Sequence, residues 1–160
     1  MARAPWWRGA RGEWYVLAQF ALFALVAFGP RSCPGWPPIP DAFGVRAAGV
    51  ALMSAGFLLM LAGILEIGAR ITPLPHPVAA AKLLTGGPYR IVRHPMYAGA
   101  ILMAFGWAAY SGGLMTLGYA AILCVFFDLK TRREERWLCE RFPEYPAYRK
   151  RVRKLVPFVY

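Results

Sequence analysis

The sequence predicts an all-α integral membrane protein that crosses the membrane about four times and carries an amphipathic helix on its cytosolic C-terminal side. Apolar residues make up 58% of the 160 residues and charged residues only 17%, which is too apolar for an ordinary soluble domain. The apolar residues gather into four runs, separated by segments rich in proline, glycine or charge. The length is that of one domain, so we expect residues 1–160 to form a single membrane domain.

The first two runs predict helices over residues 14–29 and 43–65. The first run is slightly short for a span until flanking residues are added. No small-residue cleavage signature follows it, so we expect it to be retained. The second run is a clearer span, and its small residues recur at helical spacing, which predicts a face for close packing against another helix. These small residues are Ala48, Ala51, Ala55 and Ala62.

Two further helices are expected over residues 96–110 and 114–127, joined as a tight hairpin by residues 111–113. Beyond Asp128 the sequence becomes strongly charged, with apolar side chains left at helical spacing. This pattern predicts a separate, short interfacial helix that ends before Pro143.

Basic residues fall mostly on one side of this topology. With four spans, the N-terminus, residues 66–95 and the C-terminal tail share a side and hold 17 of the 19 Lys and Arg residues, because only Arg31 and Arg46 fall on the other. The positive-inside rule then places both termini in the cytosol, as in a multi-pass protein of the bacterial inner membrane. The net charge of +11 therefore indicates membrane lipids rather than nucleic acid as partners. The scattered cysteines predict no metal site.

The segment 84–99 (LTGGPYRIVRHPMYAG) interrupts the apolar runs with glycines, arginines and tyrosines. Its glycines stop one element, and Pro95 suits the first position of the next helix. Arg90, Arg93 and His94 would then lie beside a helix N-terminus, where free N–H groups and the helix dipole favour anions. A basic, aromatic loop at the membrane interface would also explain the segment.

A second polar cluster follows the fourth run and consists of Lys130, Arg132, Arg133, Glu134 and Glu135. Because the third and fourth helices form a hairpin, we expect Pro95 and Lys130 to lie close together on one side of the membrane. A lipid-binding basic tail would explain the cations of this cluster. It would not explain two adjacent glutamates at the end of a membrane helix.

The two clusters together resemble a known group of enzymes. GPYRxxRHPMYxG, followed after about 35 residues by EExxL and then by FxxYxxY with a basic run, is similar to the isoprenylcysteine carboxyl methyltransferase and phospholipid methyltransferase superfamily. The resemblance covers roughly residues 80–157 and makes them the cofactor-binding, catalytic half. It implies transfer of the methyl group of S-adenosylmethionine, bound on the cytosolic side, to a lipid or a lipidated small molecule.

The resemblance also implies roles for single residues. The cofactor would lie against Ala81, Lys82, Leu83, Leu84, Tyr89, His94, Pro95, Met96, Tyr97 and Glu134. Glu134 and Lys130 would be catalytic, with Lys130 binding the acceptor where the prenylcysteine enzymes have an arginine. A lysine is a point charge and cannot make the paired hydrogen bonds that an arginine makes to a carboxylate.

The resemblance favours a carboxylate acceptor, as in isoprenylcysteine O-methylation, and a carboxylate is already ionised at neutral pH. A phospholipid amine is the alternative acceptor and would need a base, for which Glu134, Glu135 and His94 are candidates. Two other classes remain open, namely a membrane reductase of the sterol-reductase type that binds NADPH and a non-catalytic lipid-binding protein. His76, between two prolines, is expected to be incidental.

Overall fold

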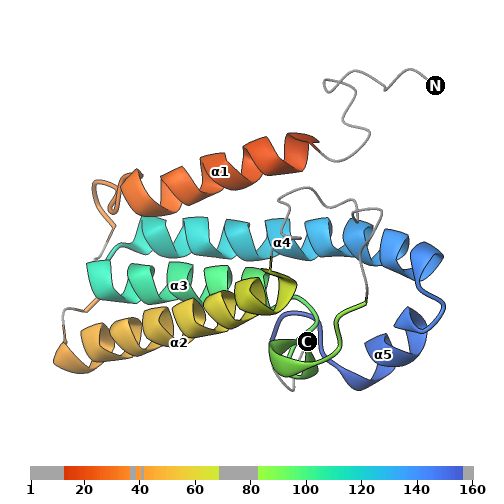
Figure 1. Cartoon of the computed structure of the whole chain (residues 1–160). Coiled ribbons are helices and arrows are strands. Elements are labelled where there is room, and N and C mark those ends of the chain that lie inside the picture. Colours follow the sequence, from red (N-terminus) through yellow and green to blue (C-terminus); the bar gives the residue numbers. More distant parts are fainter. Residues whose placement is uncertain (1–12, 37–38, 41, 69–82, 157–160) are drawn as a thin grey trace.

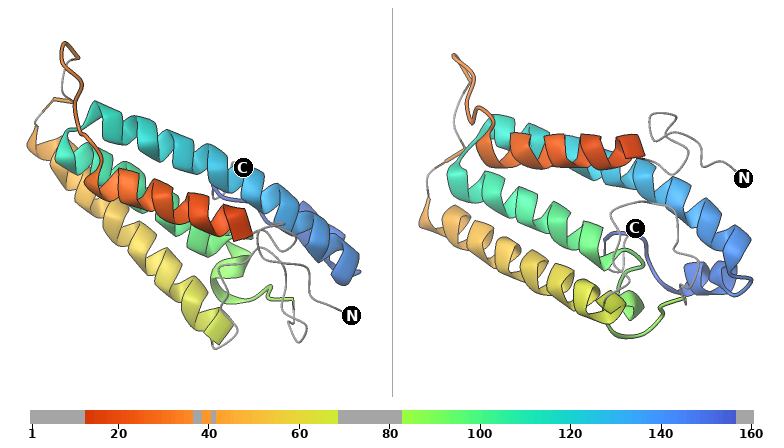
Figure 2. Two further views of the ribbon diagram at one scale, coloured as in Figure 1. Left: turned by 90° about the horizontal axis from the view of Figure 1, so that it is seen from above. Right: turned by 45° about the horizontal axis from the view of Figure 1, so that its top comes forward.

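The apolar runs form four long helices in the computed structural model, which describes residues 13–36, 39–40, 42–68 and 83–156 (Figure 1). These helices are α1 (Glu13–Phe28), α2 (Phe43–Ile67), α3 (Pro95–Ser111) and α4 (Leu114–Arg141). Two short helices complete the described part of the chain, η3 (Gly87–Arg90) before α3 and α5 (Tyr145–Arg151) after α4. The four long helices lie side by side, as the prediction of an all-α bundle requires (Figure 2).

The predicted helices agree with α1, α2 and α3 to within two residues at each end. The fourth helix differs, because α4 continues without a break through Asp128 to Arg141. The prediction of a separate interfacial helix after residue 127 is therefore wrong. Neither glycine nor proline occurs between Gly118 and Pro143, so nothing in this stretch stops a helix. The change from apolar to charged residues marks a change of surroundings along one helix.

Glycines bring α2 and α3 into backbone contact along their length. Gly49, Gly56 and Gly63 recur every seven residues on α2 and are buried. A Cβ atom added to Gly56 would lie 2.6 Å from the carbonyl oxygen of Gly99 on α3, and one added to Gly49 would lie 2.7 Å from that of Gly106. The two helices run antiparallel with almost no side chains between them, which is the close packing that small residues permit in membranes.

The alanine face predicted for α2 does not make this contact. Ala48, Ala51 and Ala55 are exposed and Ala62 is only half-buried, so the prediction of an alanine contact face is wrong. Both sets of small residues lie on α2, but only glycine, which lacks a Cβ atom, allows two backbones to approach this closely.

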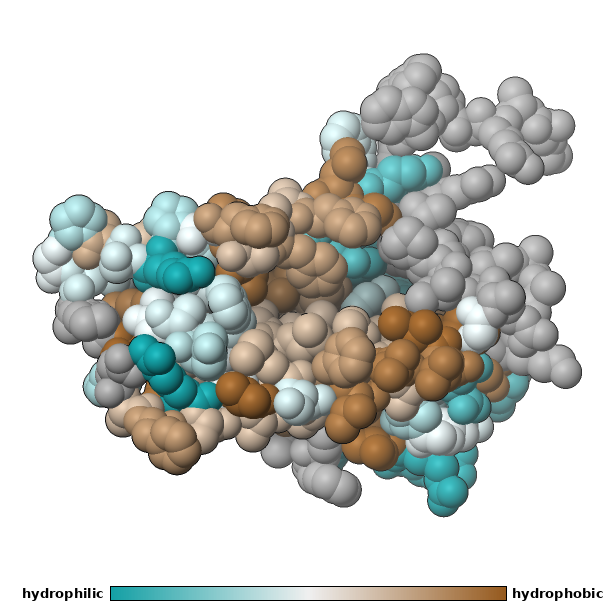
Figure 3. All heavy atoms as spheres, turned by 60° about the vertical axis from the view of Figure 1, so that its left-hand side comes forward, coloured by the Kyte–Doolittle hydropathy of each residue, from teal (hydrophilic) through white to brown (hydrophobic). Residues whose placement is uncertain are grey.

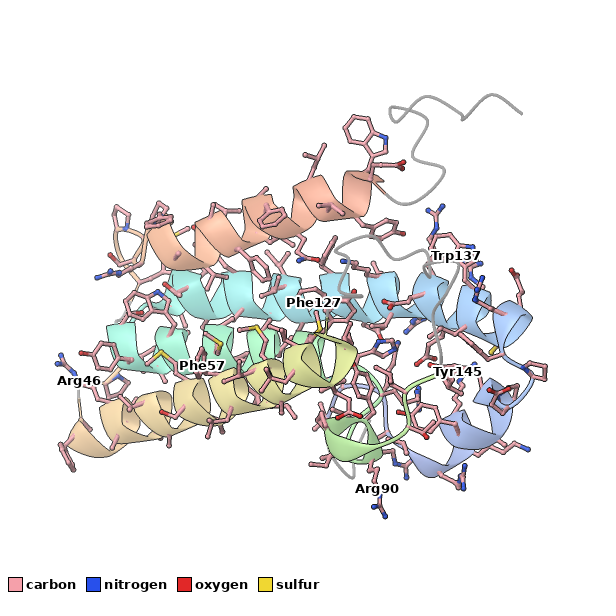
Figure 4. The ribbon with its side chains drawn as sticks, in the orientation of Figure 1. Arg46, Phe57, Arg90, Phe127, Trp137 and Tyr145 are labelled. Atoms are coloured by element: carbon pink, nitrogen blue, oxygen red, sulfur yellow. The ribbon has the colours of Figure 1, made fainter. Side chains whose placement is uncertain are left out.

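The two ends of the bundle differ in charge. We call the end with the turn between α3 and α4 the hairpin end, and it holds Arg31 and Arg46 (Arg46 is labelled in Figure 4). Two hydrogen bonds join the loop after α1 to this turn. Ile39 N–H donates to Gly112 O at 3.1 Å, and Met115 N–H donates to Arg31 O at 3.1 Å. The motif end holds η3, the start of α3, the last third of α4 and α5 (Figures 1 and 2). The described basic residues other than the two arginines of the hairpin end lie towards the motif end.

Large apolar side chains face outwards between these ends. Figure 3 shows them as a broad brown area with hydrophilic side chains on either side of it. Phe57 and Leu58 on α2, for example, are 49% and 63% exposed. Within the described residues, α2 and α4 are long and apolar enough to cross a membrane, whereas α1 is shorter. Such an exposed apolar surface suits a lipid environment better than water.

We expect Gly56→Ala to lower the free energy of unfolding by about 1–3 kcal/mol, because the added methyl group meets the backbone of α3. Thermal unfolding of the detergent-purified protein measures this loss. Gly44→Ala is the matched control on the same helix, since an added Cβ atom there has no neighbour within 4 Å. Equal stability of the two variants would contradict the contact.

Candidate functional site

The segment 84–99, called the central segment below, turns sharply at η3 before it enters α3. Gly87 begins η3 with a φ of 48°, a left-handed conformation that side-chain-bearing residues rarely adopt. Pro95 is the first residue of α3, as predicted, and His94 precedes it as the N-cap residue. Arg90 is exposed and its side chain extends away from the bundle in Figure 4. Arg90, Arg93 and His94 were predicted to gather before α3. Of these three, only Arg93 and His94 therefore turn inwards.

The C-terminal tail holds this segment in place. Arg93 N–H donates to Arg153 O at 2.8 Å, and His94 N–H donates to Lys154 O at 3.2 Å. The Tyr148 hydroxyl donates to Tyr89 O at 2.6 Å. Burial raises the pKa of Tyr148 to about 12, so this phenol keeps its proton at neutral pH and remains a donor. The described part of the tail therefore has a structural role that the interpretation as a lipid-binding tail does not cover.

A buried lysine fastens the same tail to α4. The Lys154 ammonium lies 2.5 Å from Asp128 Oδ1 and 3.1 Å from Asp128 O, and Lys154 is only 6% exposed. Sequence reasoning missed this pair. An acidic residue directly after an apolar run was the available signal, because a charge at such a position needs a partner when it is buried.

Glu135 joins the central segment, α4 and α5. Its Oε1 atom lies 2.8 Å from Arg93 Nε and 3.2 Å from His94 Nε2, and its Oε2 atom lies 3.5 Å from Arg149 Nε. The side chains of Glu135 and Arg93 are 4% and 8% exposed. The Arg93 guanidinium also donates to the carbonyl oxygens of Val152 and Arg149. Both carboxylate oxygens of Glu135 are thus engaged with cations or His94, and Arg93 does not face the N-terminus of α3 as a free anion-binding group.

Three rings form a stack beside this network. Tyr97 on α3 stacks between His94, at a centroid distance of 5.7 Å, and Phe127 on α4, at 4.7 Å. The Lys130 ammonium lies 4.9 Å from the centre of the Tyr97 ring, within the range of a cation–π interaction. It donates to Gln19 Oε1 on α1 at 2.5 Å, and Lys130 is fully buried.

Glu134 completes the cluster. Its Oε2 atom is buried and has no hydrogen-bond partner among the described residues, although a hydrogen bond links its carboxylate to the Tyr97 hydroxyl. Lys130, one helical turn earlier, and His94 both interact with its charge. Burial raises the pKa of Tyr89 well above its usual range, and the negative charge of Glu134 raises it further. An unpaired carboxylate oxygen therefore lies among aromatic and cationic groups.

The structure brings together Tyr89, His94, Tyr97, Lys130 and Glu134 at the motif end, as the resemblance implied. Pro95 and Met96 lie at the start of α3, where their side chains approach Gly63 of α2. Leu83 and Leu84 are half-buried. Three candidates discussed above lie outside the described residues, namely His76, Ala81 and Lys82.

Gln19 is the site residue that sequence reasoning missed. It stands alone as an amide within the apolar run at residues 14–29. An amide in a membrane helix is costly unless it is hydrogen-bonded. That rule marks Gln19 as a residue in need of a partner, but it does not identify Lys130, which is 111 residues away.

A sequence profile of phospholipid methyltransferases matches residues 45–145, which is more than half of the chain and includes both clusters. The chain belongs to the phospholipid methyltransferase family. The match covers nearly all of α2 and the whole of η3, α3 and α4, whereas α1 with Gln19 and the tail after α5 lie outside it.

Two relatives and one solved structure are similar to this chain. The chain is 29% identical over 91% of its length to the cobalt-zinc-cadmium resistance protein CzcN of Cupriavidus metallidurans, and it spans 62% of that protein. It is 27% identical over 78% of its length to the probable protein-S-isoprenylcysteine O-methyltransferase of Oryza sativa subsp. indica, of which it spans 67%. Its fold is similar to a solved structure of the eukaryotic intramembrane Ras methyltransferase, isoprenylcysteine carboxyl methyltransferase, with a TM-score of 0.68, 21% identity and coverage of 99% of this chain and 55% of that one.

We expect Glu135→Ala to lower the free energy of unfolding by about 3–5 kcal/mol, because it leaves the buried Arg93 without its charge partner. Denaturant titration in detergent measures the change. Glu140→Ala, at an exposed position on the same helix, should change stability by less than about 0.5 kcal/mol. Similar losses for the two variants would show that Glu135 does not hold the three elements together.

Proposed function

We propose that the protein is an integral membrane methyltransferase that transfers a methyl group from S-adenosylmethionine to a lipid or lipidated acceptor, with a carboxylate as the preferred acceptor group. The buried, unpaired Oε2 atom of Glu134 beside the Tyr97 ring carries the proposal. Membership of the phospholipid methyltransferase family supports the reaction type. The cluster lies at the motif end, where a membrane-borne acceptor and a soluble donor can both reach it.

The described residues fit the donor. S-adenosylmethionine, when bound, supplies an electrophilic methyl group on a positively charged sulfur. A carboxylate oxygen without a partner and the face of an aromatic ring both stabilise such a cation. Glu134 offers the carboxylate oxygen, and Tyr89 offers a ring, while Tyr97 holds the Glu134 carboxylate through its hydroxyl. We assign the donor to these residues and His94, and the resemblance adds residues 81–84 and 95–96 to the candidates.

Lys130 suits an anionic acceptor. Its ammonium is buried and held by the amide oxygen of Gln19. The neutral amide orients the ammonium, and Glu134 one helical turn away also interacts with its charge. A carboxylate acceptor would bind beside this cation. A carboxylate needs no base, and the chain has only to align the reactants and exclude water.

The same geometry disfavours an amine acceptor. A buried cation opposes binding of a protonated amine, even though it would lower the pKa of that amine. Glu135, one of the candidate bases, has both oxygens engaged with Arg93, His94 and Arg149. Glu135 is therefore a positioning residue, and Glu134 is the carboxylate that remains for contact with reactants.

We place the motif end in the cytosol, since Arg31 and Arg46 are the only described basic residues that belong to the hairpin end. Cys33 follows α1 at the hairpin end, and Cys139 lies near the end of α4. An impermeant thiol reagent should label Cys33 in intact cells and Cys139 only after permeabilisation. The opposite labelling pattern would reverse the orientation.

Glu134→Gln preserves the shape of the side chain and removes its charge. Affinity for labelled S-adenosylmethionine should fall about ten- to a hundredfold, as expected for a lost interaction with a charged group. Equilibrium binding to the detergent-purified protein measures it. Glu140→Gln, on the exposed side of α4, should bind as the unaltered protein does.

The same assay separates the other functional classes. A membrane reductase would bind NADPH in place of S-adenosylmethionine, and a non-catalytic lipid-binding protein would bind neither. Saturable binding of NADPH alone by the unaltered protein would contradict the proposed reaction.

Lys130→Ala should raise the KM for carboxylate acceptors by about tenfold or more and leave binding of the donor nearly unchanged. Gln19→Glu should raise the same KM, because a carboxylate opposite Lys130 neutralises the charge that the acceptor needs. Lys150→Ala, exposed on α5, is the charge-matched control. The assay uses purified protein in lipid with a carboxylate panel and an amine panel. Unaltered kinetics of Lys130→Ala on every accepted substrate would remove its assigned role.

A further inference from the structure

A polar cavity lies on the α5 side of α4. It has a volume of about 890 Å³ and is open between the charged end of α4, α5 and the segment that follows α5. It is lined by Arg93, Arg132, Glu135, Arg136, Cys139, Glu140, Arg149, Arg153 and Lys154. Glu134 is absent from this lining, because it lies about 100° around the helix from Glu135. We call this cavity the basic groove.

Cations exceed carboxylates in the basic groove. Its lining has six basic side chains and two acidic ones. Asp128, just outside, pairs with Arg132 at 2.7 Å and with Lys154 at 2.5 Å. Glu135 pairs with Arg93 and more loosely with Arg149. With Asp128 included, three acidic side chains balance three of the six basic ones, which leaves an excess of three positive charges.

Arg136 and Arg153 account for most of this excess. The structure shows no ion pair for either side chain among the described residues, and both side chains are exposed in the groove. Arg136 comes from α4, whereas Arg153 comes from the segment after α5. The backbone of that segment is fixed by the hydrogen bond from Arg93 N–H to Arg153 O, at 2.8 Å. Two guanidinium groups are therefore held on separate elements around one opening.

We propose that the basic groove binds a phosphate group, and that an anionic phospholipid headgroup supplies it. Guanidinium groups bind phosphate oxygens through paired hydrogen bonds, and the one or two negative charges of a phosphate ester would offset part of the excess of three positive charges. The volume of the groove exceeds what a small inorganic ion needs and falls within the usual range for ligand sites. The groove follows the apolar part of α4 directly, so it lies at the depth of the headgroups, where basic residues attract anionic lipids. This site is independent of the methyl transfer proposed above.

The test compares two variants of equal charge change. Arg136→Ala/Arg153→Ala removes the two guanidinium groups of the groove, and Lys150→Ala/Arg151→Ala removes two exposed cations of α5 outside it. Binding of phosphatidic acid to the full chain in detergent is measured by native mass spectrometry, and a fatty acid serves as an anionic lipid without phosphate. The groove variant should bind phosphatidic acid about tenfold or more weakly, while the α5 variant should change by less than about twofold.

A displacement experiment and a single variant complete the test. Inorganic phosphate should fail to displace phosphatidic acid if the headgroup is the source, and displacement at low concentration would assign the groove to free phosphate. The single variant Arg136→Gln should show part of the loss, with thermal unfolding unchanged. Equal weakening by the α5 variant, or equal binding of fatty acid and phosphatidic acid, would overturn the proposal.

Discussion

The bonds of Glu135 to Arg93 and His94 are the interaction on which the motif end depends. The Glu135 carboxylate lies on α4, its partners precede α3, and Arg93 in turn reaches carbonyl oxygens of residues 149 and 152. One buried acid thus joins three stretches that are distant in sequence. Removing one member of such a network leaves a desolvated charge, which costs more than the net contribution of the intact pair.

The adjacent residues Glu134 and Glu135 make different contacts because they lie on a helix. Successive side chains of an α-helix point about 100° apart, so Glu135 meets Arg93 while Glu134 faces Tyr97 and Lys130. The oxygens of Glu135 are engaged by its partners, whereas Glu134 keeps a buried oxygen without a hydrogen bond. That arrangement depends on α4 remaining helical beyond its apolar part. A break at residue 128 would have moved both carboxylates together relative to α3 and the apolar part of α4.

Features set by residues that are close in sequence could be predicted, whereas contacts between residues that are distant in sequence could not. Helix positions, and the start of α3 at Pro95, could be predicted because apolar runs and proline act locally. The packing face of α2 could not, since alanines and glycines both recur along it and only the fit to α3 shows that glycines are needed. The resemblance placed His94, Tyr97 and Glu134 among the candidate site residues, but it contained no information on Gln19, which lies outside the matching motifs. Bonds such as Lys154 to Asp128 depend on how the tail folds back, and no local pattern encodes that.

The bond between Gln19 and Lys130 explains why the weakly packed α1 belongs to the site. No residue of α1 is fully buried, so apolar packing alone fixes this helix loosely against α4. A hydrogen bond to an ammonium is stronger than one between neutral groups and adds directional specificity that apolar contacts lack. The amide is a neutral acceptor, so it fixes the position of Lys130 without adding a negative charge beside it. A carboxylate at residue 19 would have held α1 more tightly, but it would have cancelled the positive charge next to the Tyr97 ring. The identity of residue 19 therefore links the placement of α1 to the electrostatics around the Tyr97 ring.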